Sequence, residues 1–179
     1  MKTISKLAVI SVFSFLVIGC SSLATTQNTL NIEAIQNAEI RNLNHPQGAV
    51  FSAGQPTQEQ LSTLGNAGIK HVVSLRTAGE IDWNEQEYVE SLGGVTYHNI
   101  PIDGVGAINA VNAASLQSLL KSFGDEPVLL HCGSSNRVGA LVAISEAQEN
   151  GADADAAVEE GKRWGLTGLE PTVRSALAE

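Results

Sequence analysis

The segment from Val128 to Gly139 carries the residue types with the most evident chemistry. Cys132 ends an apolar run, and Arg137 follows it at the start of a helix-like stretch. Four small or hydrogen-bonding residues separate the two: Gly133, Ser134, Ser135 and Asn136. Backbone N–H groups at a helix start attract oxyanions and favour a nearby thiolate, and an arginine adds a forked cation for phosphate-like groups. The pattern predicts a nucleophilic cysteine at the mouth of an anion-binding loop.

Cys132 and His131 each have an alternative interpretation. Cys132 is also compatible with a buried structural thiol, because free cysteine is among the most buried residue types. His131 either tunes the thiolate from behind or closes the strand as a hydrogen-bonded histidine. A cation on a first helical turn is mildly unfavourable, so Arg137 at this place indicates that an anion is bound there.

Polar residues also follow two other predicted strands. Asp103 comes after one of them and precedes the glycine-rich segment Gly104 to Gly106, which makes it either a mobile general acid or a plain turn residue. Arg76 follows another strand, and with Glu80 it predicts an ion pair that braces the loop, with substrate contact as the alternative. Because ligands bind beyond the carboxyl ends of parallel strands, we expect Arg76, Asp103 and Cys132 to converge.

The elements that must position these residues alternate along the chain. Strands are predicted over 49–53, 69–75, 95–100 and 127–131. Thr57, with Gln60 as its capping-box partner, begins a helix that ends near Gly65. Further helices are predicted over 80–92, 109–123, 138–150, 153–162 and 171–177. This alternation predicts an α/β fold with a parallel central sheet of four to five strands, flanked by helices.

The chain resembles a known family, the beta-lactamase-hydrolase-like phosphatases within the cysteine-dependent tyrosine phosphatase superfamily. The resemblance spans roughly residues 45–175. It is carried by four motifs in order: Phe51 to Pro56, Ser74-Leu75-Arg76 with Glu80, Ile100 to Asp103, and His131 to Gly139. It implies that Cys132 is the nucleophile, that residues 133–137 form the phosphate-binding loop with Arg137 as the clamp, and that Asp103 is the general acid. No cofactor is implied.

The chain also departs from familiar tyrosine phosphatases. They place five residues between cysteine and arginine, whereas four stand here, and Val138 replaces the hydroxyl residue that usually follows the arginine. Ser134 or Ser135 is left as the possible hydroxyl partner of the thiolate. A four-residue spacing is typical of rhodanese-type sulfurtransferases, whose loop cradles a persulfide. The alternatives to a phosphatase are therefore a sulfurtransferase that uses a Cys132 persulfide, and a catalytically weak anion- or partner-binding protein.

The first residues predict export. Lys2 and Lys6 precede an apolar segment that ends in small residues before Cys20, a pattern typical of a secretory signal. The ending resembles a bacterial lipobox, which implies a signal over 1–19, a lipidated Cys20 and, with Ser21 next, the outer membrane facing the periplasm. Residues 20–44 are expected to form a tether with a short helix over 32–43, and 45–179 the phosphatase-like domain.

Composition narrows the class of partner. The chain has ten basic and nineteen acidic residues, and loss of residues 1–19 with their two lysines would move the formal charge from −9 to −11. This net negative charge argues against nucleic acid as a partner. The histidines and cysteines show no metal-ligand spacing, so no metal is expected. The expected partners are a phosphorylated small molecule or phosphoprotein, and a membrane through the lipid.

Overall fold

The computed structural model describes residues 29–178 of the chain. The predicted signal over 1–19, the lipidation site Cys20 and most of the predicted tether lie outside these residues. Within the described part of the chain, no helix has the length and apolarity needed to cross a bilayer.

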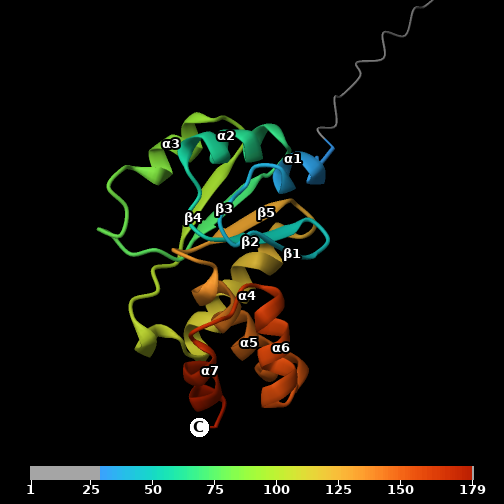
Figure 1. Ribbon diagram of the computed structural model, residues 1–179, viewed down its shortest axis with the longest axis vertical. Coiled ribbons are helices and arrows are strands. Elements are labelled where there is room, and N and C mark those ends of the chain that lie inside the picture. Colours follow the sequence, from blue (N-terminus) through green and yellow to red (C-terminus); the bar gives the residue numbers. More distant parts are fainter. Residues whose placement is uncertain (1–28, 179) are drawn as a thin grey trace, which may run out of the picture.

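One five-stranded sheet forms the centre of the molecule (Figure 1). Its strands are β1 (Asn44–Gln47), β2 (Val50–Ala53), β3 (His71–Ser74), β4 (Thr96–Asn99) and β5 (Val128–His131). Their order is β1-β2-β5-β3-β4, in which the last four are parallel and β1 is an antiparallel edge. The predicted α/β fold with a mostly parallel central sheet is confirmed. The short β1 has no counterpart among the predicted strands.

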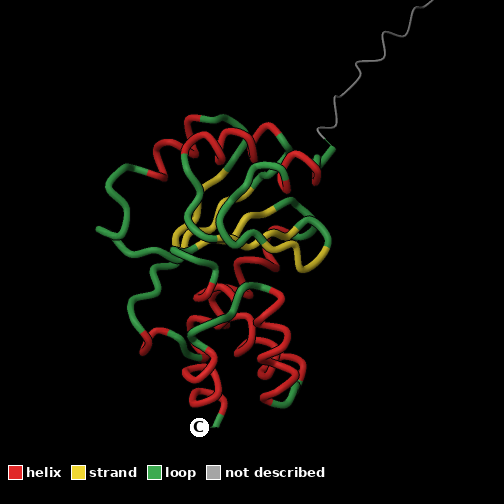
Figure 2. The backbone as a smooth tube through the Cα atoms, in the orientation of Figure 1, coloured by secondary structure: helices red, strands yellow, loops and turns green. Residues whose placement is uncertain are grey.

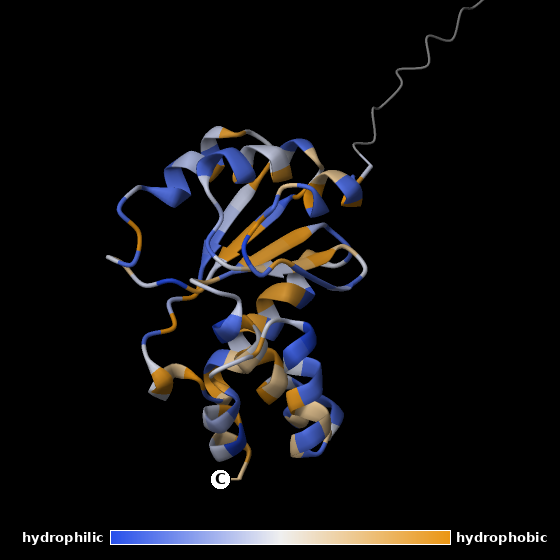
Figure 3. Ribbon diagram, in the orientation of Figure 1, coloured by the Kyte–Doolittle hydropathy of each residue, from blue (hydrophilic) through white to orange (hydrophobic). Residues whose placement is uncertain are grey.

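The helices form two layers, one on each face of the sheet (Figure 1). One layer contains α1 (Ile32–Gln36), α2 (Gln58–Asn66) and α3 (Glu85–Ser91). The other contains α4 (Ala110–Phe123), α5 (Asn136–Asn150), α6 (Ala154–Arg163) and α7 (Glu170–Leu177). Each layer packs its own apolar cluster against the sheet. In Figure 3 the apolar residues of the strands lie between these layers.

α5 is buried over most of its first three turns because the sheet and three helices surround it. Residues 138–145 are all buried, and α5 contacts α4, α6 and α7. α5 and α6 approach so closely at Gly139 and Gly161 that a side chain at Gly139 would collide with the Gly161 carbonyl oxygen at 2.5 Å. The helix that follows Cys132 is therefore fixed in place by the core.

Several predicted boundaries differ from the structure. α3 begins only at Glu85, so the first residues of the predicted helix over 80–92 form a loop instead. Ile35 and Ile40 are buried in the core, so the packed domain includes residues that were assigned to the tether before position 45. The predicted helix over 109–123 is present as α4, and Val111 in its first turn is 74% exposed. The capping box of Thr57 and Gln60 is present as predicted.

Three loops leave the carboxyl ends of adjacent strands. Figure 2 shows the loops after β3 and β4 extending from the same edge of the sheet. The loop after β5 starts there too, because β5 pairs with β3 in parallel, with His131 opposite Ser74. The candidate site lies where these three loops meet.

Candidate active site

Cys132 directly follows β5, the central strand, and its side chain is only 1% exposed. It is the one free cysteine among the described residues. It lies in the wall of a pocket of about 310 Å³, which we call the Cys132 pocket. The rest of the wall comes from the loop after Cys132, the first turn of α5 and two neighbouring loops: Gly104, Val105, Gly133, Ser134, Asn136, Arg137 and Leu169.

Backbone N–H groups line part of this pocket. Within residues 29–178, no acceptor is recorded for the amide of Gly133, while an antiparallel bridge pairs the loop at Ser134 with Gly54. The amides of the first turn of α5 are the unpaired donors that every helix start presents. N–H groups at a helix start, together with the helix dipole, are donors of the kind that an oxyanion accepts.

Ser135 turns the chain from the loop into α5 and is buried. Its φ of +67° lies in the left-handed region, which is uncommon for a residue with a side chain. Its hydroxyl donates to the Trp164 carbonyl oxygen at 2.8 Å, and Ser52 donates to the same oxygen at 3.0 Å. Gly165 packs against it so closely that a Cβ there would meet Ser135 Oγ at 2.7 Å. Ser135 thus anchors the loop, and Ser134 is the hydroxyl left facing the Cys132 pocket.

Asn136 has a structural part in the same region. Its Oδ1 accepts a hydrogen bond from the Thr167 amide at 2.8 Å and a longer one from the Leu169 amide at 3.3 Å. These contacts hold the segment before α7 against the first turn of α5. Leu169 is consequently placed at the rim of the Cys132 pocket.

The guanidinium of Arg137 is held by four acceptors from two other loops. Nη1 lies 2.9 Å from Oε1 of Glu80, and Nη2 lies 2.5 Å from Oε2 of the same carboxylate. Nη1 also donates to the carbonyl oxygens of Leu75 at 3.2 Å and Ile102 at 2.9 Å. No partner is recorded for the Nε–H or for a second Nη2–H in the described chain. Those two parallel donors form the fork that an oxyanion accepts best.

The main partner of Glu80 is Arg137, which the sequence did not indicate. Glu80 was predicted to pair with Arg76, and that ion pair exists, with Arg76 Nε 3.5 Å from Oε2 of Glu80. The two hydrogen bonds from Arg137 are much shorter. Together with donors from Thr77, and against the opposing effect of burial, they lower the pKa of Glu80 to about 2. Only the tertiary fold brings Glu80 to Arg137, 57 residues away.

His131, the residue before Cys132, is fully buried. Its Nε2 is 3.3 Å from Oε2 of Glu85, an ion-pair distance without the alignment of a hydrogen bond. Glu85 also accepts hydrogen bonds from Gln55 at 2.5 Å and from the Tyr97 hydroxyl at 3.2 Å. Burial raises the pKa of Glu85, but the nearby His131 and the hydrogen bonds from Gln55 and Tyr97 outweigh this effect, so the pKa is lowered. The histidine has a carboxylate partner that the sequence did not indicate.

Gln55 links this buried pair to Arg76. Its Oε1 accepts from Arg76 Nη1 at 2.8 Å while its amide nitrogen donates to Glu85. Arg76 also donates to the Glu80 carbonyl oxygen. The predicted role of Arg76 as a brace of the loop after β3 agrees with these contacts, and Arg76 does not line the Cys132 pocket.

Asp103 is exposed and lies next to the Cys132 pocket without lining it. The residues that follow it, Gly104 and Val105, do line the pocket, and Val105 is 60% exposed. Gly104 has a φ of +66°, so a glycine is needed for the turn that brings this loop to the rim. The structure therefore places the Asp103 loop beside Cys132 and Arg137.

No cluster of three or more histidine, cysteine, aspartate or glutamate side chains within residues 29–178 is arranged to hold a metal ion. The groups around Cys132 are an arginine, hydroxyls and backbone amides. These groups bind and polarise an oxyanion, and the thiol can attack an electrophile held by them.

Solved structures share this fold. A DUF442 protein from Shewanella putrefaciens CN-32, described as a candidate phosphatase, matches with a TM-score of 0.63 and 23% identity over 82% of this chain and 94% of that one. A second candidate phosphatase, from Neisseria meningitidis Z2491, gives a TM-score of 0.61 and 18% identity over 74% and 96% of the two chains. P. aeruginosa TpbA, solved as a cysteine-to-serine variant with pTyr bound, gives 0.55 and 19% over 76% and 82%.

No protein-family model matches the chain, and no curated protein matches it. The likenesses to these solved structures show that the chain shares their α/β fold.

Proposed function

We propose that the protein is a cysteine-dependent phosphatase that hydrolyses phosphate monoesters, as a member of the beta-lactamase-hydrolase-like branch of the tyrosine phosphatase superfamily. The observation that carries this proposal is the open fork of Arg137 next to the amide of Gly133 and the unpaired amides at the start of α5. Together they provide donors from several directions around one point, as a tetrahedral dianion requires.

The mechanism follows from these groups. The Cys132 thiolate attacks phosphorus in line and forms an S–P bond while the ester P–O bond breaks. The leaving oxygen takes a proton from Asp103 in its acid form, supplied by the loop that reaches the rim at Gly104 and Val105. A water molecule, deprotonated by the resulting carboxylate, then attacks phosphorus and breaks the S–P bond, releasing phosphate and the thiolate.

The supporting groups act by orientation and charge. Arg137 and the loop amides stabilise the charge on the transferring phosphoryl oxygens, an effect that is strongest when the donors are already in place. Glu80 fixes the plane of the Arg137 guanidinium through two hydrogen bonds. Val138 has no side-chain hydroxyl, so it offers the departing thiolate no such hydrogen bond, and we assign that donor to Ser134.

The decisive experiment compares the wild type with Cys132→Ser on p-nitrophenyl phosphate. We expect phosphate release that the substitution abolishes, and a covalent phosphate adduct on Cys132 in rapidly quenched wild-type samples. Arg137→Lys is expected to lower kcat/KM by at least about 100-fold, because an ammonium cannot form the bidentate contact. Phosphate release that persists in Cys132→Ser would refute the cysteine mechanism.

A sulfurtransferase remains the second candidate, since only four residues separate Cys132 from Arg137. In that reaction the thiolate attacks the outer sulfur of thiosulfate, forms a persulfide and releases sulfite, and cyanide then takes the sulfur as thiocyanate. Cysteine-dependent thiocyanate formation without phosphate release would establish it. If neither substrate turns over while tungstate still raises the Tm, the protein is an anion-binding member of the fold.

The lipid anchor is a separate proposal that rests on the pattern before Cys20. We expect the mature chain to begin at a lipidated Cys20 and to fractionate with the outer membrane. Cys20→Ser is expected to remove the protein from the outer-membrane fraction, while Cys132→Ser leaves it there. Unchanged fractionation of Cys20→Ser would contradict this proposal.

A further inference from the structure

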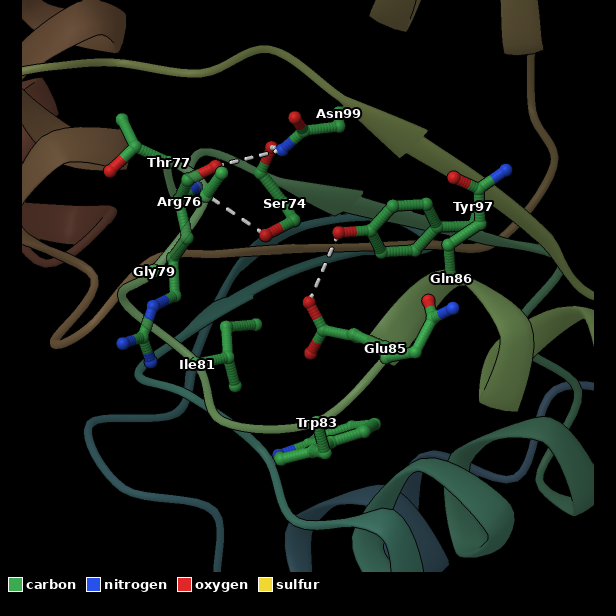
Figure 4. Close-up of a pocket in the computed structure, with 12 residues that line it drawn as sticks. Ser74, Arg76, Thr77, Gly79, Ile81, Trp83, Glu85, Gln86, Tyr97 and Asn99 are labelled. Carbon is green, nitrogen blue, oxygen red and sulfur yellow. Dashed lines mark hydrogen bonds between the residues drawn. The ribbon is translucent and has the colours of Figure 1, made fainter.

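A second pocket, of about 270 Å³, opens at the carboxyl ends of β3 and β4 (Figure 4). Its wall contains Ser74 and Arg76 from the end of β3, Tyr97 and Asn99 from β4, and much of the segment 77–86. We call it the β3–β4 pocket. It shares no lining residue with the Cys132 pocket. The edge formed by the carboxyl ends of parallel strands is where α/β proteins bind their ligands.

The wall of the β3–β4 pocket combines unengaged donors and acceptors with apolar surface. Asn99 donates from Nδ2 to the carbonyl oxygens of Ser74 and Arg76, which leaves its Oδ1 as an acceptor. Gln86 donates to Glu90 and likewise keeps its Oε1. No acceptor is recorded within residues 29–178 for the indole N–H of Trp83. Trp83 and Ile81 add apolar side chains to the same wall (Figure 4).

The charges in the wall favour a neutral ligand. Arg76 places a guanidinium in the wall, with its Nε 3.5 Å from Oε2 of Glu80. The buried carboxylate of Glu85 faces the same pocket with its hydrogen bonds to Gln55 and Tyr97. An anion would meet the Glu85 charge, and a cation would meet the guanidinium of Arg76. A neutral molecule that carries both hydroxyl donors and acceptors meets neither penalty.

The size of the β3–β4 pocket and its aromatic lining narrow the class of neutral ligand further. A cavity of about 270 Å³ accepts a single small ring and not a large ligand. An indole in a wall that also carries planar amides suits the apolar C–H faces and the peripheral hydroxyls of a sugar ring. Trp83 is held edge-on by Tyr88, with ring centroids 5.9 Å apart, so the indole is presented in a fixed orientation.

Two ion pairs connect the β3–β4 pocket to the groups around Cys132. The segment that forms its outer wall also carries Glu80, which holds the guanidinium of Arg137. Glu85, in the wall itself, forms the pair with His131, the residue before Cys132. A ligand that moves this wall therefore moves a partner of the clamp and a partner of the residue before the nucleophile. The coupling must be equal in both directions.

We propose that the β3–β4 pocket binds a neutral polyhydroxylated molecule of monosaccharide size, and that its occupancy changes the oxyanion affinity of the Cys132 loop. The binding part stands on the β3–β4 pocket alone. The coupling part rests on the proposed function, because it requires an oxyanion at Cys132.

The first experiment titrates the protein with glucose, with glucuronate as its acidic counterpart and glucosamine as its basic one, and follows intrinsic fluorescence. Trp83 lies in the pocket wall, whereas Trp164, the other tryptophan, is only 4% exposed. We expect a saturable change with glucose at a Kd on the order of millimolar, and weaker binding of both charged sugars. Equal binding of all three, or no saturable change with glucose on the order of 100 mM, would overturn the proposed site.

Matched variants locate the binding. Gln86→Ala removes an acceptor from the β3–β4 pocket and is expected to weaken glucose binding about fivefold, the effect of one lost hydrogen bond. Gln58→Ala makes the same change at an exposed position at the start of α2, outside both pockets, and should leave the affinity unaltered. Equal affinities of the two variants would overturn the assignment to this pocket. Urea unfolding of each variant verifies that it is folded.

The second experiment measures the Kd of tungstate, a phosphate-like oxyanion, with and without saturating glucose. Coupling predicts that glucose changes the Kd of tungstate about fivefold. Tungstate should change the Kd of glucose by the same factor. Glucose binding without any change in tungstate affinity would refute the coupling and keep the site. Failure of tungstate to bind would count against the proposed function, while the glucose titration would still decide the β3–β4 pocket.

Discussion

Glu80 and Arg137, 57 residues apart in the sequence, meet through two hydrogen bonds that engage both carboxylate oxygens and both terminal nitrogens of the guanidinium. The pair joins the loop after β3 to the first turn of α5. It is possible because β3 and β5 are neighbouring parallel strands, so the segments after them start from the same edge of the sheet. The carboxylate fixes one edge of the guanidinium, and the other edge is left for an oxyanion.

Glu80→Gln is therefore expected to lower kcat/KM for p-nitrophenyl phosphate by up to about 100-fold, because the guanidinium loses its fixed plane. Glu149→Gln is the matched control, since Glu149 forms an exposed ion pair with Lys121 far along α5. Steady-state kinetics of both variants provide the measurement. An equal loss in the two variants would contradict a specific role for Glu80.

The pKa of Glu80 predicts a pH dependence of stability. This pKa is lowered in the folded protein from 4.5 to about 2, so the contribution of Glu80 is complete above its unfolded value. It declines as the pH falls from about 4.5 and is lost once the pH passes through the folded value near 2. Urea unfolding near pH 6 and near pH 3 should show a smaller acid-induced loss in Glu80→Gln than in the wild type. Identical losses would exclude this linkage.

Gly139→Ala is expected to destabilise the fold by about 1–3 kcal/mol or more, because the added methyl group collides with the backbones of Gly161 and Leu166. Gly106→Ala is the control, as a Cβ there has no neighbour within 4 Å and should change the free energy of unfolding by less than about 0.5 kcal/mol. Chemical denaturation measures both. A Gly139→Ala protein as stable as the wild type would contradict the close packing of α5 and α6.

Ser135→Ala is expected to cost about 1 kcal/mol of stability, because the buried hydroxyl that donates to the Trp164 carbonyl is lost. Ser122→Ala removes a comparable hydroxyl-to-carbonyl bond on the exposed surface of α4, to Leu119. It should have less than half that effect, since water replaces the lost partner. Thermal unfolding compares the two, and an equal loss would argue against a special anchoring role of Ser135.

Much of the fold was predictable from local pattern. Apolar β-branched runs mark the buried strands, and glycine or cap residues mark helix ends, so β2 to β5 and most helices lie close to the expected ranges. The prediction was wrong where tertiary contacts, and not the local sequence pattern, determine the conformation. Residues 80–84 were predicted as the start of a helix, but the chain forms a loop there and α3 begins at Glu85. In this loop Glu80 accepts a hydrogen bond from Arg137. The edge strand β1 has too few apolar residues to give a signal.

The candidate site divides in the same way. The types and spacing of Cys132, Arg137 and the small residues between them are local, and they place a thiol just before a helix start. Three features depend on contacts between residues 29 to 57 positions apart: the carboxylate that orients the arginine, the carboxylate that pairs with His131, and the serine that Trp164 engages. The sequence determined the candidate nucleophile Cys132 and its loop, because both arise from one continuous segment. Only the tertiary structure decided the partners, because the order of strands in the sheet sets which loops meet.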